Sequence, residues 1–321
     1  MIRILHGDCR EVLATLPSGI VQCCVTSPPY YGLRDYGVAG QIGLEASPDA
    51  FVAEMVAVFR EVRRVLRDDG VLWLNLGDSY CSTAPGTMGD ALHQRGILAG
   101  VSDRRAEGSR KYRPSTPQGM KPKDLLGIPW QVAFALRADG WYLRSDVIWA
   151  KPNPMPESVT DRPTSAYEHV FLLTKSARYF WDAEAIAERS EYPGDNRALR
   201  TDTRKAIDPF CADNGSRART GQPTGATRNA RNVWTISTQP FSEAHFATFP
   251  PELAERCIKA GSKAGDTILD PFAGAFTTAL VADRLQRDAI GIELNPEYCA
   301  MAERRLVKDA GLFAEIAPNA L

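Results

Sequence analysis

Two consecutive prolines, flanked by a serine and two tyrosines, lie in the segment VTSPPYYGLRDYG, residues 25–37. The apolar residues before them are typical of a buried strand, and proline cannot continue a central strand because it lacks the N–H donor. In α/β proteins, ligands bind at the carboxyl ends of strands. A rigid turn that carries Ser27 and Tyr30 at such an end therefore indicates a candidate site, although a structural turn is the simpler explanation of this segment taken alone.

A second group of polar side chains follows two predicted strands near the end of the sequence. The segment TILDPF is expected to form a strand that ends at Asp270, and Thr277 or Thr278 is expected to cap the helix that follows. Residues 288–294 form the next strand and end with Glu293, 23 positions after the first acid. This spacing suits a Rossmann-type site, in which the first turn holds the ligand and the second acid binds ribose hydroxyls.

The order of the predicted elements is unusual, because the chain ends one helix after the second of these strands. A doubly wound sheet needs further strands, and the N-terminal part supplies them: residues 2–8 form one, and residues 21–27 form another that runs into the two prolines. Termini usually lie at the surface and often close together, so a circular permutation is physically allowed. We therefore predict an α/β fold, a circularly permuted Rossmann-like sheet whose cofactor half is encoded last.

The middle of the chain continues the alternation of helices and strands. Ser47 and Pro48 form an N-cap and first-turn pair, followed by apolar residues at helical spacing as far as Leu66. Further elements are expected at residues 70–78 (strand), 129–138 (helix), 141–151 (strand) and 166–176 (strand).

Composition bounds the class of protein. The chain has 321 residues, of which 44% are hydrophobic and 24% charged, as in soluble globular proteins. No apolar run approaches the roughly 20 residues of a membrane span, and the N-terminus lacks the apolar core of a signal peptide. The seven cysteines show no CxxC spacing and do not cluster with the four histidines. We expect reduced thiols, a cytoplasmic protein and no metal site.

Two segments are strongly basic in a chain whose net charge is −1. Residues 103–123 carry seven basic and two acidic side chains, and residues 197–231 carry eight and three, so each has a net charge of +5. Both are rich in Gly, Ser, Thr and Pro and lack periodic apolar residues. Either segment alone is best interpreted as a solvated loop, but two of them favour a polyanionic partner.

Together these motifs resemble those of the β-class amino-methyltransferases of DNA, in which the target-base motif precedes the cofactor motif. TSPPY, residues 26–30, is similar to the catalytic motif, and DPFAGAFTT, residues 270–278, to the S-adenosylmethionine loop. IGIELNPEY is similar to the acidic ribose-binding motif, and HGD at residues 6–8 to the motif for the cofactor's adenine. Residues 149–176 and 246–253 are also typical of the family.

The resemblance implies roles for individual residues. Ser27 and the Pro28 carbonyl would accept hydrogens from an exocyclic amino group, Tyr30 would stack on a flipped-out base, Glu293 would hold the ribose and Asp8 the adenine amino group. The implied catalytic residues are Ser27, Pro28, Pro29 and Tyr30. The implied cofactor-binding residues are Asp8, Asp270, Pro271, Phe272, Gly274, Thr277 and Glu293.

The resemblance also implies double-stranded DNA as the partner and a division of the chain. Residues 1–82 would form the catalytic half, 83–123 an inserted basic loop, 124–188 the remaining catalytic strands, 189–240 the target-recognition region and 241–321 the cofactor half. The candidate DNA contacts are Arg104, Arg105, Lys111, Arg113, Lys151, Arg197, Arg200, Arg217, Arg219 and Arg228. The sequence leaves open whether the protein is a homodimer and whether it has a paired restriction endonuclease.

One residue departs from the family pattern. The loop usually reads Gly-Ser-Gly, whereas this chain has Gly274, Ala275 and Phe276. Glycine often stands where a backbone closes on a cofactor. We expect the Phe276 side chain to point into the core, since the alternative is a loss of cofactor affinity.

Cytosine N4 is the predicted target because Ser27 precedes the two prolines: a hydroxyl can accept from an amino group and donate to a ring acceptor. Adenine N6 is the alternative within the class. Methylation at cytosine C5 needs a nucleophilic cysteine, and Cys23 and Cys24 are expected to be core residues of the strand. Two remoter alternatives are a NAD-type oxidoreductase, which lacks GxGxxG and leaves SPPY unexplained, and an inactive DNA-binding relic, suggested only by Phe276.

Overall fold

The computed structural model describes residues 1–33, 35–81, 117, 119–190, 226–239, 249–310 and 316–318. The chain divides into two compact units, one formed by residues 1–181 and 232–321 and the other by residues 182–231. Within the described residues of the second unit, β6 (Glu188–Arg189) pairs antiparallel with β7 (Thr227–Arg228).

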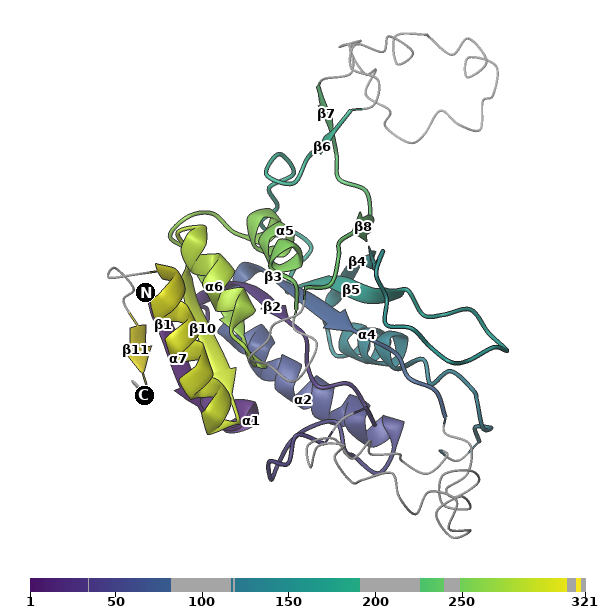
Figure 1. The fold of residues 1–321 in the computed structure, drawn as a ribbon. Helices are drawn as coiled ribbons and strands as arrows, with labels where there is room; N and C mark the ends of the chain where they lie inside the picture. The colour runs from purple at the N-terminus through teal and green to yellow at the C-terminus, as the bar shows by residue number, and fades with distance from the viewer. Residues whose placement is uncertain are drawn as a thin grey trace, which may run out of the picture. The chain divides into compact units, whose positions relative to one another are not determined.

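The first unit contains a nine-stranded sheet among its described residues, in the order β11-β1-β10-β9-β2-β3-β5-β4-β8 (Figure 1). The strands are β1 (Ile2–His6), β2 (Val21–Thr26), β3 (Leu66–Leu76), β4 (Tyr142–Ala150), β5 (Tyr167–Thr174), β8 (Val233–Thr235), β9 (Thr267–Asp270), β10 (Asp288–Glu293) and β11 (Ile316–Pro318). Neighbouring strands from β11 to β3 are parallel, whereas β5 is antiparallel to both β3 and β4.

The strand order confirms the predicted circular permutation. The strand β10, encoded late, pairs in parallel with β1, encoded first, so that His6 lies opposite Glu293. On the other side of β10, β9 continues the sheet to β2, where Cys24 lies opposite Leu269. Strands from the first and last parts of the sequence are therefore neighbours in the sheet.

Helices cover both faces of the sheet (Figure 1). The helices α1 (Cys9–Thr15), α2 (Pro48–Val65) and α4 (Ile128–Ala138) pack together on one face. The helices α5 (Pro251–Gly261), α6 (Thr277–Arg284) and α7 (Pro296–Ala310) pack together on the other. None of the helices in the described part of the chain is long and apolar enough to cross a bilayer.

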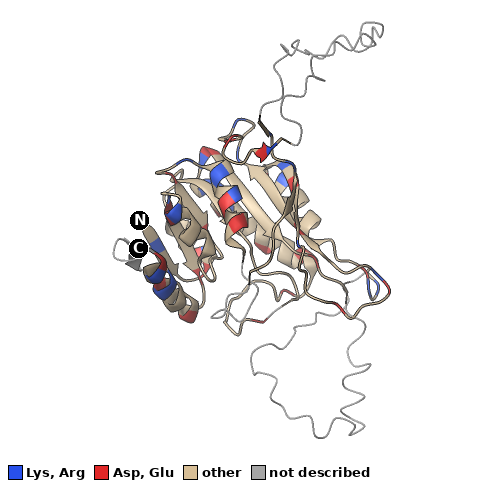
Figure 2. Cartoon of the chain, turned by 45° about the horizontal axis from the view of Figure 1, so that its top comes forward, with Lys and Arg blue, Asp and Glu red and all other residues tan. Residues whose placement is uncertain are grey.

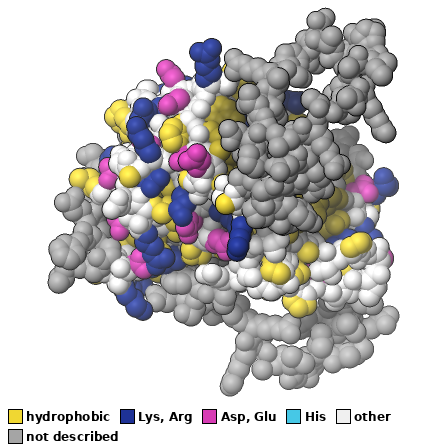
Figure 3. Space-filling view, turned by 90° about the horizontal axis from the view of Figure 1, so that it is seen from above, with side chains coloured by type: hydrophobic (Ala, Val, Ile, Leu, Met, Phe, Trp, Pro, Cys, Tyr) yellow, Lys and Arg dark blue, Asp and Glu magenta, His cyan; other side chains and the backbone are white. Residues whose placement is uncertain are grey.

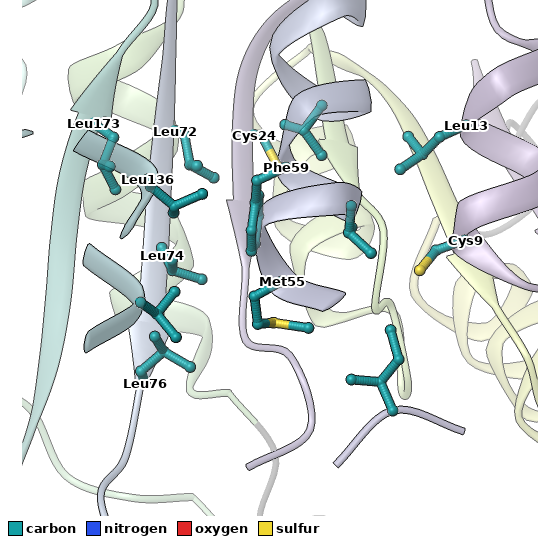
Figure 4. Packing of buried hydrophobic residues seen from close by; sticks show 14 of the residues in the cluster. Cys9, Leu13, Cys24, Met55, Phe59, Leu72, Leu74, Leu76, Leu136 and Leu173 are labelled. Atoms are coloured by element: carbon teal, nitrogen blue, oxygen red, sulfur yellow. The ribbon is translucent and has the colours of Figure 1, made fainter. Parts of the chain in front are cut away.

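The main core lies between the sheet and the layer of α1, α2 and α4. Figure 4 shows Phe59 of α2 beside Cys24 of β2, and Leu136 of α4 beside Leu72 of β3. Burying a side chain of this size contributes roughly 1.5–3 kcal/mol. The apolar residues at helical spacing therefore form the faces by which α2 and α4 pack against the sheet.

Local signals in the sequence set several helix ends. The Ser47 hydroxyl accepts a hydrogen bond from the Ala50 amide and Pro48 begins α2, as predicted. The helix α5 was not predicted, although Pro251 at its first position and Leu253 were signals for it. On its solvent side, glutamates pair with basic residues one turn later (Figure 2).

On the face seen in Figure 3, basic and acidic side chains of the described residues are interspersed. This mixture agrees with a net charge of −1 for the chain.

Candidate active site

A cavity of about 420 Å³ lies at the carboxyl ends of the parallel strands. Its position is a switch point of the sheet, because β9 leads through α6 to β10 on one side, whereas β2 leads through α2 to β3 on the other. Ligands of open α/β sheets bind at such points. All eleven predicted catalytic and cofactor-binding residues line this cavity: Ser27, Pro28, Pro29, Tyr30, Asp8, Asp270, Pro271, Phe272, Gly274, Thr277 and Glu293.

Asp270 joins the two predicted motifs at the switch point. Its carboxylate accepts a hydrogen bond from the Thr26 hydroxyl at 2.7 Å and from the Phe272 amide at 3.1 Å. Burial raises the pKa of Asp270 to about 6, although hydrogen bonds from Thr26, Thr278 and Phe272 oppose the rise. The residue before Ser27 is thus bound directly to the first acid of the cofactor motif.

Glu293 is held by the cofactor loop itself. One carboxylate oxygen accepts from the Gly274 amide at 2.8 Å, and the other accepts from the Asn295 amide at 2.8 Å. Burial raises the pKa of Glu293. An ionised carboxylate has about four acceptor positions, so capacity remains for a hydroxyl group of a ligand.

Asp8 is the N-cap of α1, and its carboxylate is bound by Arg10, a residue that the sequence analysis missed. Its side chain accepts from the Arg10 amide and pairs with the Arg10 guanidinium, which lowers the pKa of Asp8. The same guanidinium donates to the Gly40 carbonyl at 2.9 Å and contacts Glu54 at 3.1 Å. A ligand at Asp8 would therefore share the carboxylate with Arg10.

Phe276 points into the core, which confirms the expectation. The residue has a φ of 56° and is fully buried, and it does not line the cavity. A Cβ atom added to Gly291 of β10 would lie 2.3 Å from Phe276 Cε1. The absence of a side chain at Gly291 therefore makes room for the ring.

The expected cap of α6 is wrong. Phe276, in the left-handed conformation, occupies the N-cap position, and Thr277 is already the first helical residue. Arg305 of α7 donates to the Ala275 carbonyl at 2.6 Å and to the Thr277 hydroxyl at 3.0 Å. A long-range contact therefore replaces the local cap that the sequence suggested.

The target-base motif is packed against β3. Pro28 is buried, and the Tyr30 ring covers Gly77, where an added Cβ would lie 2.5 Å from Tyr30 Cε2. Tyr30 Oη donates to Glu168 Oε2 at 2.6 Å, and Ser27 Oγ lies 3.4 Å from Tyr30 Oη.

Polar residues on the middle strands complete the site, and the sequence analysis missed two of them. Asn75 of β3 donates to Glu168 of β5 at 3.0 Å, and both line the cavity. The available signal was a polar residue inside each apolar strand, in LWLNLGD and AYEHVFLL. Lys151, predicted as a DNA contact, pairs with Glu168 in the cavity wall and lies 4.4 Å from the centre of the Trp149 ring.

Most predicted DNA contacts lie outside the described residues: Arg104, Arg105, Lys111, Arg113, Arg197, Arg200, Arg217 and Arg219. Arg228 of the second unit pairs with Glu188 at 3.4 Å.

The two cysteines of β2 occupy the core, as predicted. Cys23 and Cys24 are fully buried, and burial raises the pKa of Cys24 well above its ordinary value. A thiol with such a raised pKa stays protonated, and the protonated form is not the nucleophile. In the described part of the chain, no group of three or more His, Cys, Asp and Glu side chains is arranged to hold a metal ion.

The cavity fits a nucleoside-containing cofactor. Its volume lies within the roughly 300–1,000 Å³ of small-molecule sites. The buried Asp270 ends β9 and the half-buried Glu293 ends β10, the Gly274 amide of the intervening loop donates to Glu293, and the Phe276 ring leaves the space free. Beside this half of the cavity, Pro28 and Pro29, which follow β2, and Tyr30 line a second half.

Fold and cavity define a doubly wound α/β protein with a nucleotide-type site at the switch point of its sheet. The profile of the DNA methylase family that modifies N6 or N4 amino groups matches residues 21–304, and the chain belongs to this family. It is 47% identical to the Type II methyltransferase M.Cfr9I of Citrobacter freundii, over 94% of this chain and 87% of the relative. It is 36% identical to the DNA adenine methyltransferase YhdJ of Escherichia coli, over 94% and 82%.

Solved structures share the fold. A putative DNA modification methylase from Thermus thermophilus, complexed with S-adenosyl-L-methionine, has a TM-score of 0.60, 24% identity and full coverage of both chains. The cytosine-N4-specific PvuII DNA methyltransferase has a TM-score of 0.60 and 19% identity, covering 94% of this chain and 85% of its own.

Proposed function

We propose that the protein transfers a methyl group from S-adenosylmethionine to the N4 amino group of a flipped-out cytosine in DNA. The observation that carries the proposal is the direct bond between the two motifs, from the Thr26 hydroxyl to Asp270 at 2.7 Å. It joins the start of the target-base turn to the start of the cofactor loop. A base held by one motif and a methyl donor held by the other would therefore meet in one cavity.

The cofactor half supplies binding groups for the methyl donor. Glu293 would accept from the ribose hydroxyls, the amides near Gly274 would line the loop, and Asp8 would accept from the adenine amino group while retaining Arg10. S-adenosylmethionine, when bound, supplies a methyl group on a positively charged sulfur. The carboxylate of Asp270 would favour this charge electrostatically.

The target-base half prepares the amino nitrogen. The nitrogen lone pair is conjugated into the ring, and acceptors at Ser27 Oγ and the Pro28 carbonyl would rotate the amino group and free it. Tyr30 would stack on the base and compensate the few kcal/mol that extrusion costs. Fixed alignment of the reacting atoms can supply roughly 7–11 kcal/mol of the barrier.

Cytosine is proposed over adenine because a hydroxyl, and not a carboxylate, stands at Ser27. The likeness in fold to a cytosine-N4-specific enzyme agrees with this proposal, whereas the 36% identity to an adenine methyltransferase keeps adenine N6 as the second candidate. The two candidates share the same cavity and the same roles for the residues around it.

Double-stranded DNA is proposed to contact the two basic segments, with the target-recognition region at residues 189–240 and a further basic loop at residues 83–123. Residues 103–123 and 197–231 each carry a net charge of +5, which supports this assignment. Lys151 pairs with Glu168 in the cavity wall and stays a predicted DNA contact.

Methylation of random-sequence DNA, followed by modification-sensitive sequencing, tests the proposal. The expected result is N4-methylcytosine at one position of a fixed sequence. N6-methyladenine would correct the base and leave the reaction class intact. A folded protein that binds no S-adenosylmethionine in calorimetry and methylates no DNA would overturn the proposal.

A further inference from the structure

A chain of hydrogen bonds joins the proposed acceptor of the amino group to a carboxylate on β5. Ser27 Oγ lies 3.4 Å from Tyr30 Oη, which lies 2.6 Å from Glu168 Oε2. The other Glu168 oxygen binds Lys151 Nζ. All four side chains line the cavity, and those of Glu168 and Lys151 are only 16% and 17% exposed.

The ion pair fixes the direction of this chain. Beside Lys151, Glu168 is a carboxylate and can only accept hydrogen bonds, so Tyr30 donates its hydrogen to Glu168. Asn75 Oδ1 also lies 3.2 Å from Tyr30 Oη. Glu168 Oε2, at 2.6 Å, is the closer and better acceptor. The Tyr30 oxygen then accepts from Ser27, whose lone pairs are left for a donor inside the cavity.

Asn75 keeps Glu168 in this position. Its amide nitrogen donates to Glu168 Oε2 at 3.0 Å and to the His169 carbonyl at 3.1 Å. Since β3 and β5 are hydrogen-bonded neighbours in the sheet, the position of Glu168, the last acceptor of the hydrogen-bond chain, is fixed by the sheet.

We propose that this chain carries the amino proton away during methyl transfer, with Glu168 as its final acceptor. The inference rests on the proposed amino-methyl transfer, and it holds for cytosine and adenine alike. The nitrogen lone pair forms the new bond to the methyl carbon, and the electrons of the broken carbon–sulfur bond remain on sulfur. The N–H proton moves to Ser27 Oγ, the Ser27 proton to Tyr30 Oη and the Tyr30 proton to Glu168.

The chemistry of the two hydroxyl groups that lie between the amino nitrogen and Glu168 requires such a route. A protonated serine hydroxyl is too strong an acid to persist, so Ser27 can take a proton only while it gives up its own. The methylated nitrogen is itself strongly acidic, because its conjugation with the ring returns when the proton leaves. Glu168 can therefore accept the proton.

Single-turnover methyl transfer with saturating DNA and cofactor tests the relay. Glu168→Gln keeps the shape of the side chain but removes its proton-accepting charge, and Tyr30→Phe keeps the ring but breaks the chain. We expect each to slow transfer by at least about 100-fold, the lower range for acid–base catalysis. Because both act on one route, the double variant should be no slower than the slower single variant.

Two further readouts separate a relay from a structural role. Cofactor affinity and extrusion of a fluorescent base analogue should both stay within about threefold of the original protein in both variants. Asp139→Asn, which removes a carboxylate paired with Arg60 outside the cavity, is the matched control and should leave the rate unchanged.

Transfer by Glu168→Gln or Tyr30→Phe within threefold of the original rate would overturn the relay, as would multiplicative effects in the double variant. These outcomes require an active original protein. If the original protein binds cofactor and DNA but transfers no methyl group, the proposed function has failed instead.

Discussion

Replacing the buried carboxylate between the two motifs should make the folded protein more stable at neutral and alkaline pH. Asp270 is 7% exposed and its pKa is raised to about 6 by burial. In Asp270→Asn, Oδ1 can still accept from Thr26 and Phe272. The new amide can donate to the Thr278 hydroxyl, whose own hydrogen then goes to the Val25 carbonyl, 3.3 Å away, instead of to residue 270. The variant therefore keeps its hydrogen bonds and loses the cost of burying a charge.

The magnitude follows from the pKa values. Asp270 has an ordinary pKa of 3.8 in the unfolded chain and about 6 in the folded one. The gap corresponds to roughly 3 kcal/mol, because each pKa unit is worth about 1.4 kcal/mol. Between these two values the folded state binds more protons than the unfolded state, so this contribution to stability falls as the pH rises through 6. Below about pH 4 both states are protonated and the cost disappears.

The measurement is the free energy of unfolding in urea between pH 4 and 8, without cofactor. Asp270→Asn should exceed the original protein by up to about 3 kcal/mol at pH 8, and the difference should shrink towards zero near pH 4. Asp266→Asn is a matched control, because Asp266 is also 7% exposed but faces the Arg67 guanidinium at 3.6 Å. That variant loses an ion pair and should be less stable at pH 8. A gain for Asp270→Asn that does not change with pH, or a loss at pH 8, would refute the reasoning.

Three other predictions concern the cofactor, the loop and the DNA. Glu293→Ala should weaken binding of S-adenosylmethionine by roughly 1.5–3 kcal/mol in calorimetry; unchanged affinity would remove Glu293 from the site. Gly291→Ala should lower the free energy of unfolding by about 1–3 kcal/mol, because the new methyl group meets Phe276, and should cost less in a Phe276→Ala background. Equal costs in both backgrounds would contradict this packing. Neutralising one phosphate-contacting arginine of residues 103–123 or 197–231 should reduce the slope of log affinity against log salt by about one; unaltered affinity and slope after neutralising both segments would show that they are only solvated loops.

The sequence by itself determined the parts of the fold that are encoded locally. Ser47 and Pro48 mark the start of α2, and the order of the strand and helix patterns predicted the circular permutation. The cofactor motif could be recognised because its strand, loop and second acid lie within 23 positions. Parallel strands end at one edge of a sheet, so the meeting of Ser27 and Asp270 also followed from the predicted strand order.

Tertiary structure alone decided which side chains complete the cavity. Asn75 and Glu168 are 93 positions apart, and they meet because β3 and β5 pair antiparallel in one register. A shift of one residue in that register would turn Glu168 to the other face of the sheet. The same holds for Phe276, whose ring needs the empty space at Gly291 on a neighbouring strand. Such contacts depend on the packing of distant segments, which no local pattern of residue types specifies.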